Sequence, residues 1–243
     1  MRILLTIEYN GKNFAGWQIQ PGFRTVQGVL AEIISIAGGC FVELHASGRT
    51  DAGVHAFKQM VHFDTTSHLP CDKYPQIINP LLPNDVSIIK SERVDDDFHA
   101  RFNVKKKTYM YKCYKSNVAR PLLEDFAYRI SYDVDIEKMK KAAEKLVGKH
   151  DFTSFKKASD KKKDCVRTIF NIDITESNEN IEFVVCGSGF MHNMVRIIVG
   201  TLLDVGRGKL SVEAVDDMLK NKNRCLAGVT LPAHGLYLKD VEY

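Results

Sequence analysis

Apolar and polar positions alternate along the chain with two periods, and the change from one period to the other predicts its elements. Branched apolar residues at short spacing predict strands, and apolar residues at helical spacing after Thr25 predict a helix that ends at Gly38-Gly39. The first hundred residues are expected to form a strand at 2–9, a helix at 26–37, strands at 40–44 and 59–64, a helix at 73–78 and a strand at 86–94. This order is typical of a ferredoxin-like unit, an antiparallel sheet with its helices on one face.

The rest of the chain repeats these kinds of elements without repeating the sequence. Alternation over 107–114 predicts a strand that places Tyr109, Tyr111 and Cys113 on one face. It is followed by a helix capped by Asp135, strands at 165–175 and 181–186, helices at 191–205 and 211–220, and a closing strand at 235–241. We therefore predict an α+β fold of two ferredoxin-like or RRM-like halves, residues 1–100 and 101–243. Their antiparallel sheets are expected to join into one extended sheet, with the active-site cleft between the halves.

One predicted helix carries a charge in apolar surroundings. Between Met191 and Val205 the apolar stripe widens until it almost encircles the helix, which predicts burial. Arg196 lies in the middle of this segment. Because a guanidinium does not lose its proton in proteins, a buried one needs a carboxylate or several acceptors within reach.

Composition places the chain among ordinary globular proteins. It has 243 residues, 44% of them hydrophobic and 26% charged, enough for one large or two smaller cores. The six cysteines form no CxxC pair and no cluster with histidines, so neither a zinc site nor disulfides are expected, and reduced thiols favour a cytoplasmic protein. The apolar start is short and the most apolar later segment is charged, so we expect neither export nor a membrane span.

The positive charge is small but uneven. The formal net charge is +4, yet residues 105–120 hold six basic and no acidic residues, and residues 156–167 hold six basic and two acidic ones. Such runs are often solvated faces. The first run also contains Tyr109, Tyr111 and Tyr114, and cations combined with aromatic rings bind phosphates and stack on bases. The pattern thus favours a nucleic acid as partner without excluding a solvated face.

The string Gly-Arg-Thr-Asp-Ala-Gly-Val-His-Ala at 48–56 is the most informative motif. Its two glycines bracket Asp51 and allow a sharp turn with the carboxylate at its tip. Taken alone, an Asp before Ala-Gly can simply cap a turn. The whole string, however, resembles the catalytic loop of the TruA family of tRNA pseudouridine synthases, in which this Asp is the nucleophile.

Other segments extend the resemblance over nearly the whole chain. They are Tyr9-Asn10-Gly11, where Asn10 replaces the usual Asp, and Gly16-Trp17-Gln18, Lys107-Thr108-Tyr109, Asp151–Phe155, Met194-Val195-Arg196 and Gly235–Leu238. The resemblance implies that Tyr109 is an active-site residue and that Arg196 pairs with Asp51. The Tyr109 ring can stack on the target base and its hydroxyl can assist removal of the C5 proton, and both roles remain open. The resemblance also implies that Arg49 positions the target nucleotide. As further RNA contacts we expect His99, Arg101, Lys106 and Lys107, whereas Trp17 is expected to anchor its loop by packing. His55 is not assigned to the catalytic set, since a structural hydrogen bond explains it equally well.

The resemblance implies a homodimeric enzyme that needs no cofactor and isomerises uridine in the anticodon arm of tRNA, at positions 38 to 40. Attack at C6, attack at C1′ and a glycal route all remain open. One alternative is an RNA-binding module whose sheet stacks bases without catalysis. Another is a methyltransferase or deaminase, although no cofactor loop or zinc spacing supports it.

Overall fold

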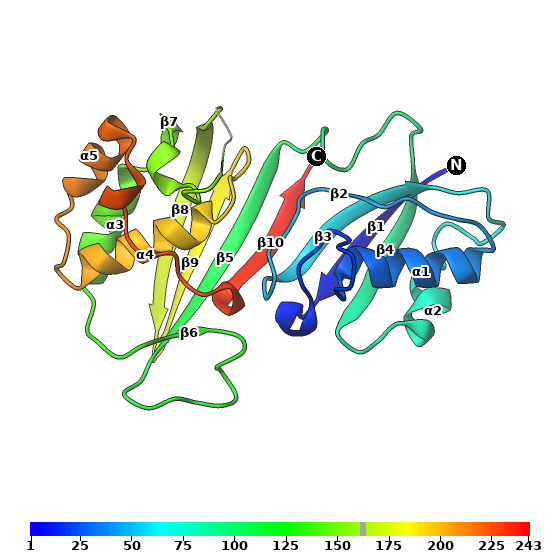
Figure 1. Ribbon diagram of the computed structural model, residues 1–243, viewed down its shortest axis with the longest axis horizontal. Coiled ribbons are helices and arrows are strands. Elements are labelled where there is room, and N and C mark those ends of the chain that lie inside the picture. The colour runs from blue at the N-terminus through cyan, green and yellow to red at the C-terminus, as the bar shows by residue number, and fades with distance from the viewer. Residues whose placement is uncertain (161–163) are drawn as a thin grey trace. The chain divides into compact units, whose positions relative to one another are not determined.

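The computed structural model describes residues 1–160 and 164–243 and divides into two compact units (Figure 1). Unit 1 contains residues 1–105 and 237–243, and unit 2 contains residues 106–236. Both units combine helices with a mainly antiparallel sheet, so the predicted α+β class is confirmed. The closing strand lies in unit 1 and not in the second half, because it pairs with a strand of unit 1.

The sheet of unit 1 has the strand order β4-β1-β3-β10. These strands are β1 (Arg2–Tyr9), β3 (His55–Asp64), β4 (Val86–Val94) and β10 (Leu236–Glu242), and the short β2 (His45–Ala46) pairs with β3. The central β1 is antiparallel to both β3 and β4. In contrast, β10 runs parallel to β3, so the sheet is not purely antiparallel as expected.

Two helices cover the core of unit 1 and lie side by side (Figure 1). They are α1 (Val26–Gly38) and α2 (Tyr74–Ile78), with 3₁₀ turns at Gly11–Asn13 and Asn79–Leu81. The Thr25 hydroxyl accepts the amide of Gly28, and Gly39 ends the helix in the left-handed region at φ +67°, as the sequence predicted. The fully buried apolar residues of this unit include Ile3, Leu5, Ile7, Val26, Leu30 and Phe63.

The strand expected at 40–44 does not form. Residues 41–44 have no regular structure, although Val42 and Leu44 are buried and Phe41 is 85% exposed. Side chains of α1 take the place of a neighbouring strand, because Ser35 accepts the amide of Val42 and Gln27 donates to the carbonyl of Leu44. The alternation therefore reflects an extended segment packed on the core. The strand predicted at 59–64, which is β3, begins at His55 and not at Gln59.

The sheet of unit 2 has the strand order β5-β9-β8-β7, with all three pairs antiparallel. The strands are β5 (Lys106–Lys115), β9 (Asn180–Gly187), β8 (Val166–Ser177) and β7 (Gly148–Asp151). A short β6 (Tyr128–Ile130) runs parallel to β5. The sequence did not predict β6 or β7, because three or four residues are too few to show a period.

Three helices lie in the described part of unit 2, and Figure 1 shows α3 and α4 packed together against its strands. They are α3 (Ile136–Glu144), α4 (Met194–Gly206) and α5 (Ala214–Asn221), with 3₁₀ turns at Thr153–Phe155, Arg224–Leu226 and Ala233–Gly235. Asp135 caps α3 as predicted. Every residue of α4 except Arg196 is buried, which confirms an apolar helix in the core. Across the described residues, no helix is long and apolar enough to cross a membrane.

Candidate active-site residues

The loop that carries Asp51 connects β2 with β3 in unit 1. Asp51 is half-buried and its carbonyl accepts the amide of Val54 at 3.2 Å, which closes a turn. Gly53 lies within this turn at φ +80°, a conformation that favours glycine. The sequence predicted this turn, with the Asp51 carboxylate carried by it. Arg49, two residues earlier, is exposed on the same loop.

The segment from Gly11 to Trp17 braces this loop. The amide of Trp17 donates to the carbonyl of Thr50 at 3.1 Å, and Trp17 is only 2% exposed, which confirms it as a packed anchor. A Cβ on Gly16 would lie 2.8 Å from the Thr50 carbonyl oxygen, and one on Gly11 would lie 2.1 Å from that of Val54. Both glycines therefore permit a backbone approach that a side chain would prevent.

His55 also supports the loop. It is 2% exposed, its Nδ1 accepts the amide of Gly11 at 3.1 Å, and its ring stacks on Tyr237 with centroids 4.7 Å apart. These contacts tie the start of β3 to the loop after β1 and to β10. Of the two readings that the sequence left open for His55, these contacts support the structural one.

Tyr109 lies near the start of β5 in unit 2. It is 9% exposed, and its ring meets Phe190 edge to face with centroids 5.1 Å apart. Tyr111 and Cys113 follow it and are buried, and burial raises the pKa of both groups. Tyr111 donates to the carbonyl of Pro232 at 2.8 Å.

Tyr111 is therefore too deeply buried to stack on RNA, although the tyrosines among the basic residues had suggested a stacking surface along β5. Tyr114, on the opposite face, is also buried and donates to Glu124. Residues on both faces of β5 are buried, so an alternating pattern could not indicate which side faces solvent. Among these three tyrosines, only Tyr109 keeps a measurable exposed fraction.

Arg196 lies in the first turn of α4. Its Nε donates to the carbonyl of Leu231 at 2.6 Å, and its Nη1 donates to Oδ1 of Asn193 at 2.9 Å. The expectation of several acceptors is thus confirmed. The expectation of burial for the guanidinium is wrong, because Arg196 is half-buried in an otherwise buried helix.

Asn193 holds the Arg196 side chain, a contact that the sequence did not indicate. It precedes α4 in the left-handed region at φ +64°, which is uncommon for a residue other than glycine. Its amide oxygen accepts from Arg196, so the strained residue orients the guanidinium. The left-handed conformation also explains why α4 begins at Met194 and not at Met191.

The basic runs are partly neutralised by acidic neighbours. Lys115 pairs with Glu176 and Arg120 with Glu179, both acids on the hairpin of β8 and β9. Lys106 is exposed and Lys107 is half-buried at the start of β5. The second run, 156–167, lies partly outside the described residues, at 161–163.

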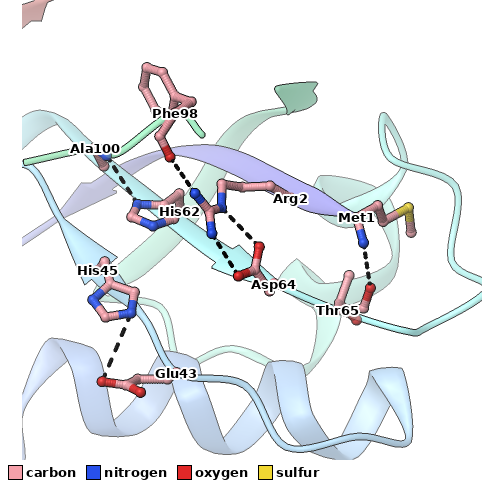
Figure 2. A network of polar contacts seen from close by, with 9 residues as sticks. All are labelled: Met1, Arg2, Glu43, His45, His62, Asp64, Thr65, Phe98 and Ala100. Carbon is pink, nitrogen blue, oxygen red and sulfur yellow. Dashed lines mark hydrogen bonds and ion pairs between the residues drawn. The ribbon is translucent and has the colours of Figure 1, made fainter. Parts of the chain in front are cut away.

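His99 belongs to a histidine cluster in unit 1. Its ring lies 4.6 Å from that of His62, which stacks on His45 at 4.9 Å. Figure 2 shows His62 accepting the amide of Ala100, at 3.0 Å, beside Arg2, which pairs with Asp64. Burial and the neighbouring imidazoles and Arg2 lower the pKa of His62 to about 4.

The histidine cluster gives His99 a packing role that the sequence did not indicate. Within residues 1–160 and 164–243, no group of His, Cys, Asp and Glu is arranged to hold a metal ion. Arg101 is exposed nearby, with its guanidinium carbon 5.8 Å from the centre of the Phe102 ring. Acidic residues also flank His99, at positions 95–97.

The predicted catalytic residues are distributed over both units. Asp51 and Arg49 share one loop of unit 1. Tyr109 and Arg196 belong to unit 2, on β5 and α4. The pairing of Asp51 with Arg196 stays a prediction.

Comparison with known proteins identifies close relatives over the full length. The model of a family described as tRNA pseudouridine synthase matches residues 5–103 and 142–243. A tRNA pseudouridine synthase A of Anoxybacillus flavithermus is 48% identical, with 100% of this chain and 98% of the relative covered. That of Bacillus subtilis is 45% identical, with 100% and 99% covered.

Solved structures are more distant. The crystal structure of an archaeal box H/ACA complex of Nop10 and Cbf5 matches with a TM-score of 0.38 and 12% identity, covering 83% of this chain and 44% of that one. At this score the likeness supports no argument.

Proposed function

Because the chain belongs to the tRNA pseudouridine synthase family, it is an isomerase of uridine in tRNA, and we propose that Asp51 is its nucleophile. We further propose that the target lies in the anticodon arm, at positions 38 to 40. One observation carries the assignment of Asp51. The unbroken string at 48–56 forms a turn that carries this carboxylate and that the segment from Gly11 to Trp17 braces.

The chemistry explains why a carboxylate is needed. The N1–C1′ bond breaks, the uracil ring turns, and a C5–C1′ bond forms, while C5 loses a proton and N1 gains one. The isomerisation involves no net oxidation, so it requires neither an oxidant nor a reductant. A carboxylate can add to C6 or C1′, or take a proton from C2′, and a second group must accept the C5 proton.

Arg196 and Tyr109 are proposed to complete the site. A guanidinium at contact distance stabilises a carboxylate, so Arg196 is proposed to pair with Asp51. The two acceptors that hold Arg196 support a fixed orientation for it. The Tyr109 ring, which Phe190 supports edge-on, is suited to stack on the extruded base.

Contacts to the tRNA backbone are proposed for Arg49, His99, Arg101, Lys106 and Lys107. Extruding a base costs a few kcal/mol, which such contacts offset. We expect the exposed Arg49 to contribute one phosphate contact. Arg49→Gln should therefore reduce the slope of log binding constant against log salt concentration for tRNA by about one. An unchanged slope would remove Arg49 from this set.

We also propose that the protein is a cytoplasmic homodimer. Sedimentation equilibrium of the purified protein would test whether it is a dimer.

The function is tested with an unmodified tRNA transcript and no other additive. We expect the wild-type protein to form pseudouridine within positions 38 to 40, as mapped at nucleotide resolution. Asp51→Ala should lower turnover by about 10⁴-fold or more while tRNA affinity is retained. Asp72→Ala, an exposed acid of the same unit, serves as the control. Tight binding without product from the wild-type protein would instead indicate an RNA-binding module.

A further inference from the structure

A buried polar network lies against the Asp51 loop, entirely within unit 1. It contains Tyr9 of β1, Gln59 of β3, and Ser47 and Thr50 of the loop itself. Their exposed fractions are 3%, 0%, 0% and 7%. Polar side chains at this depth lose their hydration, so their hydrogen bonds must compensate for it.

Gln59 bonds to the first part of the loop with both ends of its amide. Its Oε1 accepts the hydroxyl of Ser47 at 2.6 Å, and its Nε2 donates to the carbonyl of Gly48 at 2.8 Å. The amide of Ser47 in turn donates to the carbonyl of Met60 at 2.7 Å. One side chain of β3 thereby sets the direction in which the chain leaves β2.

Tyr9 bonds to the part of the loop next to Asp51. Its hydroxyl shares a hydrogen bond of 2.7 Å with Oγ1 of Thr50, while the Thr50 carbonyl accepts the amide of Trp17. Burial raises the pKa of Tyr9, so its hydroxyl remains protonated. Thr50, the residue before Asp51, is thus held through both its side chain and its backbone.

We propose that Gln59, Tyr9 and Thr50 are positioning residues that hold the Asp51 loop in its reactive geometry. The inference rests on the proposed function, in which Asp51 is the nucleophile. Hydrogen bonds are directional, whereas apolar side chains of similar volume would fill the same space without orienting the peptides of Gly48 and Thr50. A displacement of about 1 Å at a reacting group can reduce a rate about 100-fold, so these bonds bear on turnover.

The test uses variants that keep side-chain volume and remove the hydrogen bonds of one side chain at a time. Gln59→Met, Tyr9→Phe and Thr50→Val should each lower kcat about 10-fold to 100-fold, with the KM for tRNA changed less than about 3-fold. Thr50→Ser retains the hydroxyl and should restore most of kcat. Because Tyr9 and Thr50 share one bond, the double variant Tyr9→Phe/Thr50→Val should be no slower than the slower single variant.

Ser154→Ala is the matched control for loss of stability alone. Ser154 is also 0% exposed and donates to the carbonyl of Met218 at 2.6 Å, but it lies in unit 2. It should lower the unfolding temperature and leave kcat unchanged. All assays are run well below the unfolding temperature of each variant.

The outcomes separate this inference from the proposed function. Wild-type protein that forms no pseudouridine would overturn both. Product formation by the wild-type protein, together with wild-type kcat in Gln59→Met and Thr50→Val, would overturn only the positioning inference and leave the network as a purely structural feature. Thr50→Ser with a kcat as low as that of Thr50→Val would also overturn the positioning inference and leave the proposed function intact.

Discussion

Single residues determine how closely two backbone segments of the chain approach each other beside Asp51. Gly16 and Gly22 both lie at positive φ, at +96° and +78°, but only Gly16 faces the Asp51 loop. A Cβ on Gly22 would have no neighbour within 4 Å. Alanine variants of these two glycines therefore distinguish the effect of backbone strain from the effect of displacing the loop.

We expect Gly22→Ala to cost about 1–2 kcal/mol of unfolding free energy and to leave kcat unchanged. Gly16→Ala carries strain of the same kind and would also place its Cβ against the Thr50 carbonyl, so its kcat should fall about 10-fold or more. Denaturant unfolding and single-turnover rates measure the two effects. Equal kcat in both variants would show that the loop tolerates the displacement.

Another single residue, His62, makes stability depend on pH. Its pKa is near 4 in the folded protein and about 6.5 when unfolded, so the folded state favours the neutral ring. The stabilisation is complete above pH 6.5 and is lost as pH falls toward 4, by on the order of 3 kcal/mol. His62→Gln cannot titrate and should show a flatter profile of unfolding free energy between pH 6.5 and 4. Parallel profiles for the two proteins would contradict this assignment.

Secondary-structure elements were predictable where their signals are local. The cap at Thr25, the stop at Gly39 and the cap at Asp135 all lie where the sequence placed them. Strands were harder to predict from the sequence, because a strand requires a hydrogen-bonded partner strand that can be distant along the chain. The segment 40–44 has the pattern of a strand but no partner strand, because α1 takes its hydrogen bonds.

The position of Tyr109 on β5 leads to a prediction about its hydroxyl. An unperturbed phenol has a pKa of about 10 and is a poor base at neutral pH, so we expect its ring to matter more than its hydroxyl. Tyr109→Phe should retain kcat within about 10-fold, whereas Tyr109→Ala should lose more, since base stacking is lost. Single-turnover kinetics on tRNA distinguish the two. A Phe variant as slow as Asp51→Ala would instead make the hydroxyl the acceptor of the C5 proton.

The complete enzyme is expected to combine Asp51 of unit 1 with Arg196 of unit 2. An ammonium cannot reproduce the planar set of donors of a guanidinium, so Arg196→Lys should lose the bonds to Leu231 and Asn193. We expect turnover to fall about 10-fold to 100-fold. A less well-placed cation also stabilises a carboxylate less, so the pH profile of turnover should change.

Arg207→Lys, at the other end of α4, is the control for this substitution. Arg207 pairs with Asp204 at 2.6 Å and belongs to no proposed site. It should leave both turnover and the pH profile unchanged. Unchanged turnover and profile in Arg196→Lys as well would rule out the pairing.

The sequence alone determined the features that neighbouring residues control. These are the helix caps, the apolar α4, and the glycine-flanked turn that carries Asp51, because propensity, capping and turn chemistry act over a few residues. The tertiary structure decided which distant segments meet. It placed β10 in unit 1, gathered three histidines, left Arg196 half-buried, and set Gln59 and Tyr9 against the loop. Burial and hydrogen-bond partners depend on such contacts between remote residues, which no local pattern encodes.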